Sequence, residues 1–269
     1  MSEPADDAGA EGPSDIEVRS YFVRKRNALL VRGIFSDLFM DYYLHSAELK
    51  LQLAPQIDGM MKDALVAFTL HLAACPWNER HAWTVNFQKP LANFFVTGDN
   101  GRSSVVGRCF TENVKVGPTG MFHALVQKAS QPVRQSTIDF SGGDFFAAVE
   151  EFYARSEQRR GRFFEHSDED YVFVSAQPQC DLGWLEGLTQ DDVRKLDRQE
   201  ELSMLETRRY HWECGCAPDR LYAALQTQAT LGLDYLFEGA EVLRAMCPRC
   251  GRRYNIDREQ FEAWLAEQA

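Results

Sequence analysis

Two closely spaced cysteine pairs near the C-terminus are the residues best suited to chemistry in this 269-residue chain. Cys214 and Cys216 form a C-x-C pair, and Cys247 and Cys250 form a C-x-x-C pair that follows after thirty intervening residues. Each pair can bind one ion through two thiolates, and four thiolates complete the tetrahedral coordination that structural Zn²⁺ prefers. The sequence therefore predicts one Zn²⁺ per chain, bound by all four sulfurs.

A zinc site of this kind can have either of two roles. Zinc binding contributes folding free energy on the order of 10 kcal/mol in small metal domains, so the ion can act as a permanent support. Zinc-bound thiolates are also the form that oxidants attack, and cysteines two or three positions apart can close a disulfide once one is oxidised. The spacing alone favours permanent support, and a redox switch stays open at this point. His211 is an alternative ligand that four thiolates make unnecessary.

No catalytic constellation is visible elsewhere, and we expect the protein not to be an enzyme. Cys75, Cys109 and Cys180 lie apart in apolar or β-prone contexts, which predicts small core residues. The six histidines are scattered, without a Ser or Asp partner suggested by local motif. A thiol oxidoreductase would use the C-x-x-C of Cys247 and Cys250 at the start of a helix. Here Gly251 and the residues after it predict a turn and a strand.

A zinc ribbon that recognises nucleic acid is a further alternative. Arg249, Arg252, Arg253 and Tyr254 place basic and aromatic side chains beside the second pair, as RNA-binding ribbons do. Residues 211–269 nevertheless hold nine acidic and six basic residues, a net charge of −3. The whole chain has a net charge of −11. Both charges disfavour a phosphate-binding surface.

Composition predicts a globular cytoplasmic protein. The chain is 45% hydrophobic and 26% charged, which is ordinary for a protein with a sizeable core. Its start is acidic and carries no secretory signal, and no apolar run is long enough to span a membrane. Four cysteines at metal-binding spacing suit a reducing compartment. Residues 1–15 are rich in Ala, Gly, Pro and acidic residues and predict a disordered tail.

The pattern of elements divides the remaining chain into three parts and predicts an α+β fold. Residues 16–180 predict an N-terminal domain, residues 181–210 a metastable linker, and residues 211–269 a small zinc-binding domain that needs its metal. In the N-terminal domain we expect helices at 36–49, 55–75 and 144–158, a hairpin turn at 98–101, and strands at 17–33, 81–87, 91–97, 103–110, 121–127, 133–140 and 171–176.

Two stretches of charged residues have specific predictions. Arg24, Lys25 and Arg26 are expected on a solvated face of the first strand. Thr189 to Arg209 predicts a highly charged helix, opened by a capping box of Thr189 and Asp192. Its apolar stripe is narrow and buries little surface, so we expect this helix to be weakly held and easily melted.

These features together resemble the 33-kDa heat shock protein family of redox-regulated holdase chaperones. The C-x-C and C-x-x-C pairs are followed by Tyr254 and a closing helix, as in that family. The helix at 150–158 ends in Ser-Glu-Gln, and the strand-turn-strand at 91–107 is also similar. The likeness spans about residues 18 to 265. The chain departs from the family at Phe87–Pro90, Arg134–Phe140 and Arg159–Gly161.

The resemblance implies a chaperone that is inactive when reduced and zinc-bound. Oxidation would form the disulfides Cys214–Cys216 and Cys247–Cys250, release zinc and unfold the linker. The protein, as a homodimer, would then bind unfolding client proteins through its N-terminal domain without ATP. With the resemblance included, the redox switch is favoured over permanent support.

Overall fold

The computed structural model describes residues 14–268, so residues 1–13 of the predicted tail lie outside the described residues. The described chain is α+β, as predicted, with a ten-stranded sheet and a separate two-stranded ribbon. The order across the large sheet is β7-β6-β3-β4-β5-β10-β1-β2-β9-β8. Its strands are β1 (Ile16–Val23), β2 (Ala28–Ile34), β3 (Glu79–Gln88), β4 (Leu91–Asp99), β5 (Ser104–Phe110), β6 (Gly120–Lys128), β7 (Arg134–Phe140), β8 (Gly161–Ser167), β9 (Asp170–Ala176) and β10 (Leu202–Trp212).

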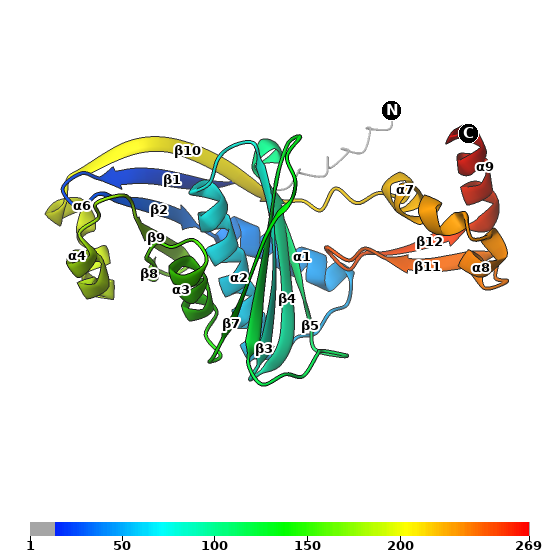
Figure 1. The fold of residues 1–269 in the computed structure, drawn as a ribbon, viewed down its shortest axis with the longest axis horizontal. Coiled ribbons are helices and arrows are strands. Elements are labelled where there is room, and N and C mark those ends of the chain that lie inside the picture. The colour runs from blue at the N-terminus through cyan, green and yellow to red at the C-terminus, as the bar shows by residue number, and fades with distance from the viewer. Residues whose placement is uncertain (1–13, 269) are drawn as a thin grey trace, which may run out of the picture.

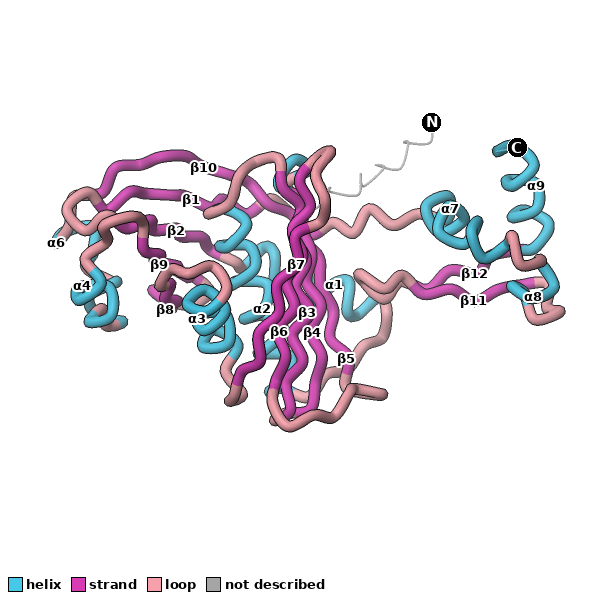
Figure 2. The backbone as a smooth tube through the Cα atoms, in the orientation of Figure 1, coloured by secondary structure: helices cyan, strands magenta, loops and turns pink. Residues whose placement is uncertain are grey.

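The large sheet consists of two wings that cross at a steep angle. Figure 2 shows β3 to β7 running across the direction of β1, β2 and β8 to β10. The helix α2 (Pro55–Ala73) contacts strands of both wings, including β4, β5, β1 and β9. Nearly every residue from Met60 to Ala73 is buried, because this helix fills the space between the wings. The shorter helices α1 (Ser36–Glu48) and α3 (Phe145–Arg155) pack beside it.

Strand β10 joins the two wings. It pairs antiparallel with β1 along its length, from Leu202 opposite Val23 to Tyr210 opposite Ile16. At its end it pairs parallel with β5, where His211 lies opposite Ser104. The prediction of one helix over Thr189–Arg209 is therefore wrong for its second half. The long-range pairing with β1 overrides local helix propensity, which is a weak determinant on its own.

Three short helices precede β10, and the last two of them replace the first half of that predicted helix. They are α4 (Leu182–Gly187), α5 (Gln190–Val193) and α6 (Leu196–Gln199), and the capping box of Thr189 and Asp192 is present as predicted. Their buried side chains lie against the outer face of β2, β8 and β9 and form a second hydrophobic core. That core comprises Val23, Ala28, Leu30, Phe164, Val172, Val174, Ala176, Leu185, Leu188, Val193 and Leu196.

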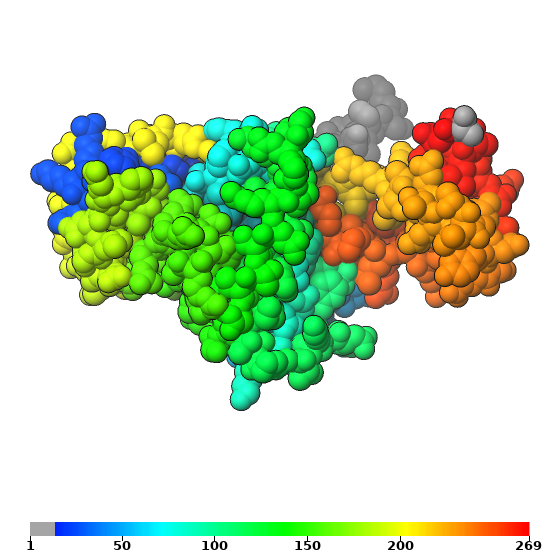
Figure 3. Space-filling model, viewed as in Figure 1, coloured from blue at the N-terminus to red at the C-terminus, as the bar shows by residue number. Residues whose placement is uncertain are grey.

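The C-terminal residues form a small lobe that stands apart from the sheet (Figure 1). It contains α7 (Pro218–Ala229), α8 (Leu233–Phe237), α9 (Arg258–Gln268) and the hairpin of β11 (Val242–Met246) and β12 (Arg253–Asp257). Its core is small, and its buried residues are Tyr222, Phe237, Ile256 and Phe261. Figure 3 shows this lobe touching the main body along one side. None of the helices between residues 14 and 268 has the length and apolar character needed to cross a membrane.

Two predictions near turns are corrected by the structure. The single strand expected at 17–33 is a hairpin of β1 and β2, and its turn contains Arg26, which pairs with Asp181 at 2.7 Å and Glu200 at 2.9 Å. Arg24, Lys25 and Arg26, which were expected on a solvated strand face, therefore lie in this turn. Through Arg26 the turn connects the hairpin to the linker. The turn between β4 and β5 contains a 3₁₀ helix at Asn100–Arg102, because the Asn100 amide is buried and hydrogen-bonded to the end of α2. The sequence patterns did not predict the strand β8 at Gly161–Ser167.

Candidate metal centre

The four cysteines predicted to bind metal lie together. Their sulfur atoms are all within 4.8 Å of one another. The Sγ atoms of Cys214 and Cys247 are 3.6 Å apart, and those of Cys216 and Cys250 are 3.5 Å apart. Four thiolates at ~2.3 Å from one Zn²⁺ would stand roughly 3.8 Å from each other in a tetrahedron. The cluster therefore has the size of a four-thiolate metal site.

Local turns position the two pairs. Gly215 and Gly251 have φ angles of +61° and +82°, a conformation that glycine adopts without strain. The second pair is closed by hydrogen bonds from the Cys247 amide to the Arg252 carbonyl at 2.8 Å and from the Gly251 amide to the Cys247 carbonyl at 2.9 Å. Strand β12 begins directly afterwards. The turn and strand predicted after Cys250 are confirmed, and this context differs from the helix that a thioredoxin-like motif requires.

The cysteine cluster is docked on the main body rather than on the C-terminal lobe alone. His45 of α1 lies 2.8 Å, through Nε2, from the carbonyl oxygen of Cys250. Arg108 of β5 donates from Nη1 to the Cys247 carbonyl at 3.2 Å. Val106 of β5 is buried against Cys247 and Cys250. No local sequence pattern indicates these contacts, since they join residues more than a hundred positions apart.

The electrostatics of the cluster favour a bound cation. Hydrogen bonds from the Cys214 thiol to the sulfurs of Cys247 and Cys250 raise the pKa of Cys214, and burial and the repulsion between thiolates add to this. A divalent ion reverses this repulsion and holds all four sulfurs as thiolates. The Tyr254 hydroxyl donates to the Cys216 Sγ at 3.0 Å, an outer hydrogen bond of the kind that orients metal ligands. The residues present therefore fit a divalent metal ion, and four thiolates are a ligand set that structural Zn²⁺ prefers.

The remaining candidates lie outside the cluster. His211, the alternative ligand, faces Asp15 at 3.2 Å and Glu213 at 3.5 Å. Burial raises the pKa of Cys109 to about 11, so this thiol stays protonated and unreactive near neutral pH. Cys180 is partly buried and packs beside the second core.

Cys75 is a buried core residue, as predicted, but it has potential metal ligands beside it. It is buried next to His71 and His81, and the three side chains form a second group of metal-ligating atoms within 4.8 Å of one another. Sequence reasoning missed this group. Its only signal is the i, i+4 spacing of His71 and Cys75 within the helix predicted at 55–75, followed by His81 on the next predicted strand.

Comparison with known proteins supports a single family. No family model matches the chain. The 33 kDa chaperonin of Nitrosococcus oceani is 22% identical over 174 residues, which cover 56% of this chain and 59% of that protein. The 33 kDa chaperonin of Lactobacillus delbrueckii subsp. bulgaricus is 24% identical over 92 residues, 34% of this chain and 31% of that protein.

The solved structure of a 33 kDa chaperonin, a heat shock protein 33 homologue from Thermotoga maritima, superposes with a TM-score of 0.70. The superposition covers 94% of this chain and 98% of that chain at 13% identity. This chain is similar in sequence to 33 kDa chaperonins and shares their fold. The predicted resemblance is confirmed, and the structural match shows that the 33 kDa chaperonin fold extends over nearly the whole chain. The curated relatives are matched over only about a third to three fifths of their length.

Two of the four residues that suggested a nucleic-acid-binding ribbon form contacts within the protein. Arg252 pairs with Glu48 at 2.8 Å, and the Tyr254 hydroxyl is engaged by Cys216. Within residues 14–268, the other two, Arg249 and Arg253, form no comparable side-chain ion pair or hydrogen bond. We therefore derive the function from the 33 kDa chaperonin fold and the cysteine cluster.

Proposed function

We propose that this protein is a redox-regulated, ATP-independent holdase chaperone. In the reduced state Cys214, Cys216, Cys247 and Cys250 bind one Zn²⁺ and the protein is inactive. Oxidation of these cysteines releases the ion and unfolds the linker, and the protein then binds unfolding client proteins. The observation that carries this proposal is the place of the sulfur cluster, which lies directly after β10 and against α1 and β5.

Because of the position of the cluster, loss of zinc would weaken the contact between the zinc-binding turns and the main body. The zinc-bound turns are held to the body by His45, Arg108 and Val106. If the ion leaves, these turns lose their fixed conformation. The contacts of their carbonyl groups and cysteine side chains with His45, Arg108 and Val106 then weaken. The end of β10 then loses its support, since the chain passes from Trp212 to Cys214 without an intervening element. Within the sheet the two wings are joined by the short pairing of β10 with β5, so loss of this strand would separate them.

The oxidation step balances with hydrogen peroxide as oxidant. The sulfurs of two thiolates give up two electrons and form an S–S bond, while the O–O bond of one peroxide breaks and takes up two protons to leave two waters. Two such steps consume all four thiolates, and Zn²⁺ departs because disulfide sulfurs are poor ligands. We assign the pairs Cys214–Cys216 and Cys247–Cys250, since bonds within each pair let the two segments separate.

Linker unfolding would uncover an apolar surface suited to client proteins. Leu185, Leu188, Val193 and Leu196 of the linker are buried against the face of β2, β8 and β9. Helices of four to six residues such as α4, α5 and α6 are not stable alone, so they depend on this packing. Once they detach, residues such as Leu30, Phe164 and Val174 become exposed, and exposed apolar patches bind other proteins.

The remaining assignments follow from this mechanism. Residues 16–180 would form the client-binding domain, residues 181–210 the linker and residues 211–269 the redox-switch domain. The partners would be unfolding proteins and, in the oxidised state, a second copy of the chain. Neither nucleic acid nor a catalysed reaction on the client is required. A reducing compartment such as the cytoplasm would keep the protein inactive until oxidative stress occurs.

The proposal is tested by treating reduced, zinc-loaded protein with hydrogen peroxide at raised temperature. Zinc release is followed with a chromophoric chelator, linker unfolding by circular dichroism, and chaperone activity by light scattering of a thermally unfolding enzyme. We expect the three changes to occur together and without ATP. A Cys109→Ser variant serves as the matched control and should respond like the wild type. Complete zinc release without suppression of client aggregation would show that the cluster is only a structural support.

A further inference from the structure

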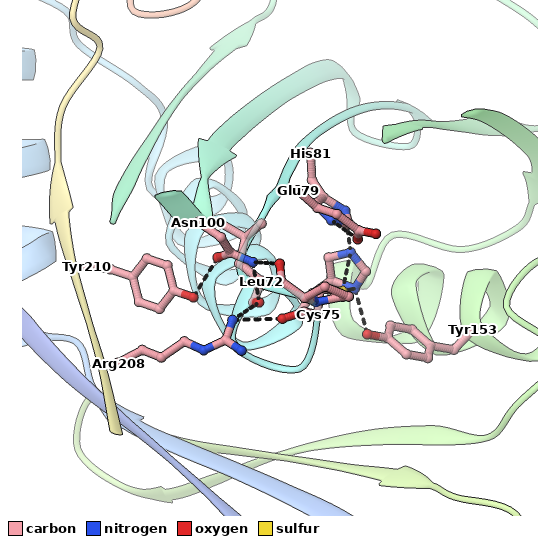
Figure 4. Close-up of polar contacts among 10 residues, drawn as sticks. Leu72, Cys75, Glu79, His81, Asn100, Tyr153, Arg208 and Tyr210 are labelled. Carbon is pink, nitrogen blue, oxygen red and sulfur yellow. Dashed lines mark hydrogen bonds and ion pairs between the residues drawn. The ribbon is translucent and has the colours of Figure 1, made fainter. Parts of the chain in front are cut away.

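A second cluster of metal-ligating side chains lies inside the main body, far in sequence from the four cysteines. His71 lies in the last turn of α2, Cys75 follows two residues after the end of that helix, and His81 comes from β3. All three are buried, with exposed fractions of 3%, 9% and 3%. Figure 4 shows Cys75, His81, Glu79 and Tyr153 converging at the end of this helix. Neither the proposed chaperone mechanism nor the four-cysteine site uses them.

The distances within this cluster match those of ligands around one ion. The His71 Nε2 lies 3.0 Å from the His81 Nδ1 and 3.6 Å from the Cys75 Sγ. In a tetrahedral site with nitrogen at ~2.0 Å and sulfur at ~2.3 Å from zinc, two nitrogens stand roughly 3.3 Å apart and a nitrogen and a sulfur roughly 3.5 Å apart. These two distances are thus within a few tenths of an ångström of those around a shared ion, and all three ligand atoms lie within 4.8 Å of one another.

The outer nitrogen of each imidazole already has the partner that metal-binding histidines use. The His71 Nδ1 lies 2.6 Å from the Tyr153 hydroxyl. The His81 Nε2 lies 3.2 Å from a carboxylate oxygen of Glu79. With an ion on the inner nitrogens, both outer nitrogens carry hydrogen and donate to these oxygens. A carboxylate behind a histidine fixes its ring and raises its basicity toward the metal.

The charges of the cluster also suit a divalent ion. A thiolate at Cys75 and the carboxylate of Glu79 together carry two negative charges, which balance one Zn²⁺ in a buried setting. Two imidazoles and one thiolate form a borderline-soft set that selects Zn²⁺-type ions over Mg²⁺ or Ca²⁺. Three protein ligands leave a fourth position for a water molecule.

We propose that His71, Cys75 and His81 form a second transition-metal site, which binds a Zn²⁺-type ion through two imidazoles and one thiolate. Glu79 and Tyr153 act as its outer hydrogen-bond partners. The site is independent of the four-cysteine cluster and of the redox mechanism proposed above. The reduced chain accordingly has a capacity of two ions rather than one.

The test is a metal titration of reduced, chelator-stripped, full-length protein. We expect the wild type to bind two equivalents of Zn²⁺ by elemental analysis after desalting. The Cys75→Ser variant should bind one, and the matched Cys109→Ser variant should still bind two. Co²⁺ serves as a spectroscopic probe: the difference between the wild-type and Cys75→Ser spectra should show a tetrahedral ion with a single thiolate-to-cobalt absorption. His81→Gln should lose the same spectral component, and circular dichroism verifies that each variant is folded.

The wild-type stoichiometry decides the outcome even if a variant is unstable. One equivalent of Zn²⁺ in the wild type, with a Co²⁺ spectrum of four thiolates only, would overturn the proposal and leave a hydrogen-bonded core cluster. A second equivalent that persists in both Cys75→Ser and His81→Gln would also overturn it, because the ion would then lie elsewhere.

Discussion

The guanidinium of Arg208 donates a hydrogen bond of 2.7 Å to the backbone carbonyl of Cys75. Arg208 lies on β10, directly before the zinc-binding segment, whereas Cys75 lies at the end of the central helix α2. The same Nη1 atom also donates to the Leu72 carbonyl at 3.1 Å, and the group is 5% exposed (Figure 4). One buried side chain thus ties the strand that we propose to unfold to the core of the main body.

Removal of the Arg208 side chain should loosen β10. The Arg208→Ala variant removes the side-chain donor of the buried Cys75 carbonyl and the ion-pair partner of Glu206, while the Leu72 carbonyl keeps the Asn100 amide as a donor. We expect a loss of about 2–4 kcal/mol in the free energy of unfolding, measured by urea denaturation of the reduced, zinc-loaded protein. The variant should also release zinc at a lower peroxide concentration. Arg209→Ala, at an exposed position one residue along, is the control, and equal losses in both variants would contradict this role for Arg208.

Some of these features could be predicted from the sequence and others could not, for a physical reason. The four cysteines were found because metal-ligand spacing is local. Strand β10 was missed because its conformation depends on β1, whose paired residues lie nearly two hundred positions away. The His71, Cys75 and His81 cluster was missed because His81 joins the other two only through the packing of β3 on α2. Contacts such as that of Arg108 with Cys247 are equally non-local.

The Tyr254 hydroxyl should slow oxidation of the zinc site. It donates to the Cys216 sulfur at 3.0 Å, which withdraws charge from the thiolate and fixes its position. In Tyr254→Phe we expect zinc affinity to fall about tenfold or more, as for other outer hydrogen-bond partners, and zinc release by peroxide to be faster. Competition with a chelator measures the first and stopped-flow release the second. Tyr235→Phe, at a 71% exposed position in the same lobe, should leave both unchanged.

Detachment of the linker helices should be sufficient for client binding if they cover the client surface. Leu196 is 3% exposed and packs on the face of β2, β8 and β9. Leu196→Asp places a charge in this core, so we expect the linker to unfold while zinc stays bound. The reduced variant should then suppress client aggregation and bind an apolar dye without oxidant. If the dye binds and aggregation is unaffected, this face is not the client surface.

The stability of the reduced protein should fall as pH rises through neutrality, in part because of Asp63. Burial, reinforced by the Asp144 carboxylate, raises the pKa of Asp63 to about 7. An unfolded chain releases this proton near pH ~3.9, so the native state holds more protons than the unfolded state between these values. Stability therefore decreases with rising pH across the window. Urea denaturation between about pH 5 and pH 8 should show a smaller decrease for Asp63→Asn than for the wild type; parallel curves would contradict the assignment.

The pairing of the oxidised cysteines is the last point that the structure makes testable. The shortest sulfur distances join Cys214 to Cys247 and Cys216 to Cys250, across the two pairs. In a tetrahedral cluster every pair of sulfurs is close, so distance alone does not choose. Crossed disulfides would hold the two segments together after zinc loss, whereas Cys214–Cys216 and Cys247–Cys250 let them part. We therefore expect peptide mapping of the active, oxidised protein by mass spectrometry to find only bonds within each pair. Crossed bonds in the active fraction would contradict release of the linker by separation of the two segments.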